Sequence, residues 1–161
     1  MLLIAVISDT HNMKRYIELG RNYIKEADVL IHLGDNSEDI KELTRDFTGD
    51  VYGVSGNCDY SNAYPMEQVL NIMGKKIFLT HGHIYGVKEN LNNIYYRANE
   101  LNADIVLFGH THENLLKREG EIVFMNPGSI SLPRLRGRYV GFIELEEEKT
   151  PHIYLKEVKA F

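Results

Sequence analysis

Four apolar segments of this chain end in the same way, and this repetition constrains its fold more than any other feature. Each stops at a small residue that is followed by Asp, Asn or His. The endings are Ser8-Asp9-Thr10-His11, Gly34-Asp35, Gly56-Asn57-Cys58-Asp59 and Gly109-His110-Thr111-His112, and a fifth, Thr80-His81-Gly82-His83, closes a hairpin. The carboxyl ends of strands in an α/β sheet border one crevice. We therefore expect these polar side chains at a single rim.

The first half of the chain alternates between strand and helix patterns. Apolar runs at 2–8, 29–33 and 51–54 are typical of strands buried on both faces. Apolar residues at helical spacing predict helices over about 13–25 and 40–47, with Ser37 placed to cap the second. This β-α-β-α-β order predicts a parallel sheet with right-handed crossovers.

The second half is richer in strands. It predicts hairpins over 68–80, 115–125 and 139–158, a buried strand over 105–108 and a helical stripe from Val87 to Leu101. A parallel start and an antiparallel end predict an α/β fold of two packed sheets with helices outside. The 161 residues correspond to one domain, residues 1–161, at about 150 residues per domain.

Composition excludes several classes of protein. With 43% hydrophobic and 25% charged residues, the chain is expected to be globular. A net charge of -5 argues against stable nucleic-acid binding. Cys58 is the sole cysteine, so an internal disulfide is impossible and a reducing compartment is expected. The apolar start, 1–7, is too short for a membrane span or signal peptide, so we predict a cytoplasmic protein without membrane association.

The donors at the predicted rim point to metal chemistry. Imidazole, carboxylate and amide oxygen together suit borderline divalent metals. Because the chain has no cluster of cysteines, a structural zinc site of the thiolate type is not expected. There are too many donors for one ion. A carboxylate such as Asp35 can bridge two ions about 3.5–4 Å apart, the spacing of two-metal phosphoesterases.

In order, Asp9-x-His11, Gly34-Asp35, Gly56-Asn57, His81 and Gly109-His110-x-His112 resemble the motifs of the calcineurin-like metallophosphoesterases. The chain length and Asn126-Pro127-Gly128-Ser129 resemble the small prokaryotic phosphodiesterase branch. The resemblance covers roughly 2–145. It implies a four-layer α-β-β-α sandwich with two mixed β-sheets flanked by helices.

The resemblance also implies a site with two divalent ions and a small phosphodiester substrate, which a hydroxide bridging the ions attacks. We expect manganese first, with nickel, cobalt, iron or zinc as alternatives. The implied ligands of one ion are Asp9, His11, Asp35 and His112, and those of the other are Asp35, Asn57, His81 and His110.

One residue departs from the family pattern. Members that hydrolyse many phosphate esters carry histidine where this chain has Cys58. A thiol donates protons and hydrogen bonds more weakly, so we expect diesters rather than monoesters as substrates. Cys58 is thus a candidate catalytic residue, with a half-buried filler as the alternative. His83 is the other candidate: it orients a ligand or touches phosphate, or it only caps a turn.

The remaining polar residues have plainer interpretations. His32, inside an apolar strand, is expected to be a core histidine with satisfied hydrogen bonds, and His152 is expected to have no role. Asp59 holds the Asn57 loop or an imidazole, or it is a simple turn residue.

Three arginines follow the last motif. One of Arg134, Arg136 and Arg138 is expected to reach the substrate phosphate, and the other two to be solvated. A homodimer supported by Tyr95 and Tyr96 is a further possibility that the sequence does not decide. The rival function is a non-catalytic interaction scaffold, as in the metallophosphoesterase-like retromer subunit of similar fold.

Overall fold

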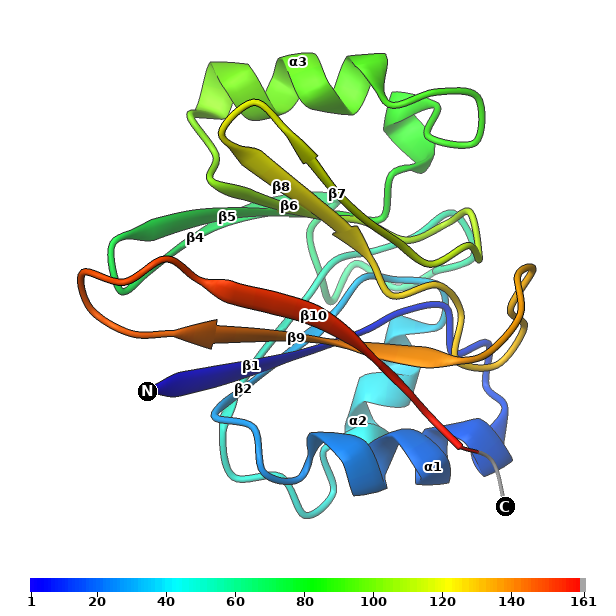
Figure 1. The fold of residues 1–161 in the computed structure, drawn as a ribbon. Helices are drawn as coiled ribbons and strands as arrows, with labels where there is room; N and C mark the ends of the chain where they lie inside the picture. The colour runs from blue at the N-terminus through cyan, green and yellow to red at the C-terminus, as the bar shows by residue number, and fades with distance from the viewer. Residues whose placement is uncertain (160–161) are drawn as a thin grey trace.

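A computed structural model describes residues 1–159, which form two mixed five-stranded sheets that pack face to face (Figure 1). The first sheet has the order β10-β9-β1-β2-β3 and the second β4-β5-β6-β8-β7. The strands are β1 (Leu2–Ile7), β2 (Val29–His32), β3 (Asp50–Gly53), β4 (Glu67–Ile72), β5 (Lys75–Thr80), β6 (Ile105–Leu107), β7 (Leu115–Glu119), β8 (Ile122–Asn126), β9 (Tyr139–Leu145) and β10 (His152–Glu157).

Helices cover the outer faces of both sheets. On the first lie α1 (Lys14–Ile24), the 3-10 turn η1 (Ser37–Asp39) and α2 (Ile40–Leu43). On the second lie η2 (His83–Tyr85) and α3 (Asn92–Leu101) (Figure 1). The expected four-layer α-β-β-α sandwich is therefore confirmed. Within residues 1–159, none of these helices combines the length and apolar character needed to cross a membrane.

The alternation of side chains along the strands explains the continuous apolar runs. In β1, Ile4 and Val6 belong to the cluster between the sheets, whereas Ala5 and Ile7 pack in the cluster that contains Ile17 of α1. All four strand residues are fully buried. A strand covered on both faces must be apolar at successive positions rather than at alternate ones.

The structure corrects two predicted helix boundaries. Residues 87–91 form a turn followed by irregular backbone, and α3 begins only at Asn92, although Val87 and Leu91 still pack in the core beneath it. Gly86, with a φ of 60°, separates this segment from η2. Similarly, α2 ends at Leu43, while Phe47 packs against the core from the irregular segment that follows the next turn. The apolar spacing predicted correctly which residues are buried, but it did not predict where the helices begin and end.

Ser37 does not cap a helix with its side chain. It is the first residue of η1, and no side-chain cap bond forms there. Its N–H instead donates to the carboxylate of Asp59.

The parallel strand pairs place the predicted endings at one edge. β1, β2 and β3 run parallel, as do β5 and β6 in the other sheet. Their carboxyl ends lie on the right in Figure 1. The sheets meet at this edge, where Nδ1 of His81 lies 2.7 Å from the carbonyl oxygen of Leu33.

Candidate metal centre

The strand endings form two groups of metal-ligand type that share Asp35. One group consists of Asp9, His11, Asp35 and His112, and the other of Asp35, His81 and His110. Within each group the potential ligand atoms lie within 4.8 Å of one another. Six of the seven expected ligands are therefore brought together from both sheets.

Buried polar atoms that have no hydrogen-bond partner within residues 1–159 face the middle of these groups. Oδ1 of Asp9 is one, at 3.2 Å from Nε2 of His112 and 3.8 Å from Nε2 of His81. Nε2 of His81 is another, at 3.3 Å from Oδ2 of Asp35. Buried polar atoms are normally satisfied. Divalent cations would satisfy both atoms, so the donor set fits metal binding.

Hydrogen bonds on the outer side of the rings determine which imidazole nitrogens face the centre. Nδ1 of His81 donates to the carbonyl of Leu33 at 2.7 Å, and Nδ1 of His112 donates to that of Leu132 at 2.9 Å. In the neutral tautomer each Nε2 then carries a lone pair. Histidine ligands of metals are usually oriented by such a bond from their other nitrogen.

The electrostatics keep the carboxylate charged and one imidazole neutral. Burial opposes ionisation of Asp35, yet His81 and the Cys58 N–H outweigh it and hold the pKa of Asp35 well below its usual range. Burial, with repulsion from His81 and Lys88, lowers the pKa of His110 to about 4. The ionised Asp35 carboxylate and the neutral His110 ring can therefore both act as metal ligands at neutral pH.

Two other predicted ligands, His112 and His81, have raised pKa values. The Asp9 carboxylate raises the pKa of His112. Burial acts against protonation of His81, but Asp35 and Asp9 raise its pKa overall. A metal must therefore compete with a proton at these two rings.

The backbone at the site adopts conformations that are costly for residues with side chains. Asp9, His11, Asp35, His110 and His112 all have a left-handed φ, between 48° and 70°. Such strain persists where surrounding contacts over-determine it and is concentrated at functional sites. This clustering is a structural signal that sequence patterns did not provide.

Asp59 supplies one of those contacts. Its carboxylate accepts the N–H groups of Asp35, Ser37 and Gly56 at 2.9, 2.7 and 2.7 Å. It therefore joins the turn after β2 to the loop after β3. Gly56 allows this close approach, because a Cβ there would lie 2.2 Å from Oδ1 of Asp35. Of the interpretations that the sequence left open, the loop-holding one is confirmed.

The turn at 126–129 fixes two further segments. The amide of Asn126 donates to the carbonyl of Gly109 at 3.1 Å and to Oγ1 of Thr111 at 3.0 Å. The hydroxyl of Ser129 donates to the carbonyl of Asp9 at 2.7 Å. The family resemblance is the sequence signal for this turn, and it does not predict these roles.

The other predicted site residues lie beside the two groups. Asn57 is exposed, and its amide donates to Sγ of Cys58 at 3.7 Å. The N–H of Cys58 donates to Oδ1 of Asp35 at 2.9 Å. The ring centroid of His83 lies 5.5 Å from that of His81 and 6.1 Å from that of His110, and its Nδ1 is buried without a partner.

His32 has the predicted core role. It is fully buried, its Nδ1 accepts the N–H of Gly34 at 3.1 Å, and its Nε2 lies 3.0 Å from Oγ1 of Thr10. Burial lowers the pKa of His32 to about 4, so the ring is neutral at neutral pH. His152, in contrast, is exposed and contacts Glu144.

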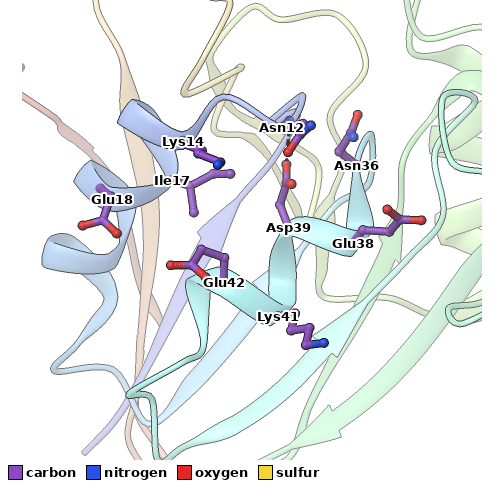
Figure 2. A pocket seen from close by; sticks show the side chains of 9 residues that line it. All are labelled: Asn12, Lys14, Ile17, Glu18, Asn36, Glu38, Asp39, Lys41 and Glu42. Carbon is purple, nitrogen blue, oxygen red and sulfur yellow. Dashed lines mark hydrogen bonds between the residues drawn. The ribbon is translucent and has the colours of Figure 1, made fainter.

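A pocket of about 460 Å³ adjoins the turns that carry His11 and Asp35 (Figure 2). It contains none of the predicted ligands. Its lining residues are Asn12, Lys14, Ile17, Glu18, Asn36, Glu38, Asp39, Lys41 and Glu42. Asp39, which is buried, accepts the N–H of Asn12 at 2.8 Å, so this region supports the turn after His11.

The calcineurin-like phosphoesterase superfamily domain matches residues 2–148 of the chain. The chain belongs to this superfamily. It is 38% identical over 138 residues to the probable metallophosphoesterase YsnB of Bacillus subtilis, covering 83% of this chain and 78% of YsnB. It is also 34% identical over 104 residues to the phosphodiesterase YfcE of Escherichia coli K12, covering 59% of this chain and 52% of YfcE.

A solved structure with similar architecture is Vps29 from Entamoeba histolytica in complex with Zn²⁺. The TM-score is 0.75, with 20% sequence identity over 98% of this chain and all (100%) of that one. This likeness confirms the metallophosphoesterase-type fold. Membership of the superfamily and the two ligand groups together indicate a metal-binding phosphoesterase hydrolase.

Proposed function

We propose that this metallophosphoesterase is a phosphodiesterase with a dinuclear metal centre. The observation that carries the proposal is that Asp35 belongs to both ligand groups. The name of the phosphodiesterase relative YfcE supports a diester substrate. The resemblance assigns Asn57 to the second ion as a further ligand.

Two divalent ions would activate water and neutralise charge on the phosphoryl group. We take manganese as the first candidate metal. Nickel, cobalt, iron and zinc are kept as alternatives, because donor type alone does not select among these metals. The chain's own contribution is to hold the donors in place. Asp9 and Asp35 provide negative charge, and the rings of His81 and His112 are oriented by their bonds to backbone carbonyls.

Cys58 and His83 are the residues that we place beside the substrate. Cys58 is exposed, which goes against the half-buried filler. Local desolvation and the Asp35 carboxylate raise the pKa of its thiol, so it is a neutral thiol at neutral pH. Burial and the charge of His81 lower the pKa of His83, which favours its neutral ring. A neutral imidazole can exchange a proton or a hydrogen bond with a substrate oxygen.

The direct test is cleavage of bis-p-nitrophenyl phosphate by the wild-type protein with each candidate metal. Asp35→Ala and Asn57→Ala are expected to abolish it, as is a chelator. Asp104→Asn, at the opposite end of the sheets, is the matched control and is expected to keep full activity. Cleavage that survives both substitutions, or that is indifferent to chelation, would exclude the proposal.

Substrate type has its own test. The pair p-nitrophenyl phosphate and bis-p-nitrophenyl phosphate measures the preference for monoester or diester. Wild type is expected to prefer the diester, and Cys58→His to increase monoester cleavage, because imidazole is a better proton donor than a neutral thiol. A wild-type preference for the monoester would contradict the assignment.

The second candidate function is a non-catalytic protein-interaction scaffold. The structural likeness to Vps29 favours it. It predicts a stable protein partner and no metal-dependent turnover, whereas the enzyme predicts bound metal and turnover. Metal analysis of the purified protein, combined with the activity test, separates the two. A cytoplasmic location and a homodimer supported by Tyr95 and Tyr96 remain predictions. Tyr96 is exposed, whereas Tyr95 packs in part against the core.

A further inference from the structure

The segment 129–134 wraps around one side of the metal centre. The hydroxyls of Ser129 and Ser131 donate to the carbonyls of Asp9 and Thr10, both at 2.7 Å. Both serines are buried. The N–H of Leu132 returns to Oγ of Ser129 at 2.8 Å. This strap is therefore bound to the turn that carries Asp9.

The strap also makes two hydrogen bonds with His112. Nδ1 of His112 donates to the carbonyl of Leu132 at 2.9 Å. The N–H of Arg134 donates to the carbonyl of His112 at 2.9 Å. The backbone position of Arg134 is therefore determined relative to a member of the first ligand group. Only its backbone is used, so its side chain remains available.

The three arginines that follow the last motif differ in their surroundings. Arg138 stacks on the ring of Tyr16, at 4.2 Å from the centroid, and donates to its hydroxyl at 3.0 Å. Arg134 and Arg136 are exposed, and within residues 1–159 neither makes an ion pair. Arg136 lacks the backbone bond to His112 that Arg134 has.

Charge complementarity favours a phosphate ligand for Arg134. A diester phosphate is an anion, and guanidinium binds its oxygens with two donors in a planar fork. Arg134 is thus the arginine that combines a determined position beside the centre with an unpaired guanidinium.

We propose that Arg134 is a substrate-binding residue, whose guanidinium pairs with a non-bridging oxygen of the diester phosphate on the His112 side of the site. This inference rests on the proposed phosphodiesterase function. It adds a residue outside the metal-ligand motifs and distinguishes it from Arg136 and Arg138. The bound phosphate is held between this cation and the two ligand groups.

The test compares Arg134→Ala, Arg134→Lys and Arg136→Ala in steady-state cleavage of bis-p-nitrophenyl phosphate at saturating metal. For Arg134→Ala we expect KM to rise about 10- to 100-fold, the loss of one charge-assisted hydrogen bond, with a smaller change in kcat. Arg134→Lys should be intermediate, because lysine keeps the charge but not the fork. Arg136→Ala should leave KM within about 2-fold, as is usual for a weakly coupled surface charge.

Three further measurements separate binding from structure. The affinity of metal-loaded protein for inorganic phosphate, measured by titration calorimetry, should fall in Arg134→Ala and not in Arg136→Ala. Metal content and Tm should match wild type in both, because Arg134→Ala keeps the backbone bond to His112 and Arg136 has no such bond to lose.

Each contrary result has a defined meaning. If Arg134→Ala matches Arg136→Ala in KM and phosphate affinity, the inference is wrong while the proposed function stands. If Arg134→Ala loses metal or Tm in parallel with activity, Arg134 is structural and the inference is again wrong. If wild type itself shows no metal-dependent diesterase activity, the proposed function fails, and this inference fails with it.

Discussion

The β1-α1-β2 unit and the β5-α3-β6 unit follow the same path, one in each sheet. Each consists of two parallel strands whose connection contains an outer helix. At their amino ends, Oδ2 of Asp28 accepts the N–H of Leu3, and Oδ2 of Asp104 accepts the N–H of Lys76, both at 2.8 Å. The same residue type thus makes the same structural contact in both.

In each unit a backbone hydrogen bond joins the carboxyl ends of the two strands, but the side chains at these ends differ between the units. The N–H of Asp9 donates to the carbonyl of Gly34 at 3.0 Å, and that of Gly109 to the carbonyl of His81 at 2.9 Å. The first unit, however, delivers both carboxylates of the centre, and the second delivers three of its four imidazoles. Each ligand group draws on both units. Neither sheet alone can therefore build the site.

The largest expected effect comes from the carboxylate that both groups share. Asp35→Asn should lower diesterase activity by about 10³-fold, because it weakens the hold on both ions, which would neutralise the charge that develops on the phosphoryl group. It should also weaken metal binding at both groups. His110→Ala, which removes an imidazole of the second unit, should weaken only the second. Metal stoichiometry by mass spectrometry distinguishes them, and equal losses in both variants would contradict the division into two groups.

The next effect concerns His32, a buried histidine of the first unit. Phe108 occupies the matching position in the second unit. The pKa of His32 is lowered from 6.5 to about 4, so below pH 6.5 the unfolded chain binds a proton that the native ring refuses. Stability should fall as the pH decreases from 6.5 to 4, by about 3 kcal/mol. Urea unfolding of chelator-treated protein measures this, with His32→Gln as the comparison. An unchanged pH slope in that variant would refute the assignment.

A smaller effect is expected at the residue that joins the first unit to the loop after β3. Asp59→Asn replaces one acceptor oxygen by a donor facing backbone N–H groups. Because Asp59 acts through Asp35, metal affinity should fall about 10- to 100-fold, as for other residues that orient ligands. Calorimetric metal titration provides the measurement. Asp28→Asn, which alters a carboxylate bound to a single N–H, is the control and should bind metal normally.

The smallest effects are expected at the amino ends. Asp28→Asn and Asp104→Asn each weaken one side-chain bond to a backbone N–H, which should cost about 1 kcal/mol of unfolding free energy. Denaturant unfolding should show similar losses for the two variants, since the units share this contact. Loss of metal in either one would break the comparison between the two ends.

The fold was predictable because burial left a clear trace in the sequence. Runs buried on both faces, such as β1, cannot be confused with exposed strands. The start of α3 was not predictable in the same way, because Val87 packs in the core from a turn and so imitates helical spacing. Periodicity records which residues are buried and leaves the backbone conformation between them undetermined.

By itself, the sequence determined the order of the elements, the strand endings and the kinds of donors that they carry. These depend on local patterns of burial and on residue chemistry. Only the tertiary structure decided that Asp35 stands in both ligand groups, that Asp59 holds its turn, and that Arg134 rather than Arg138 is free beside His112. These relations join residues far apart in the chain, so they exist only when the two sheets pack together.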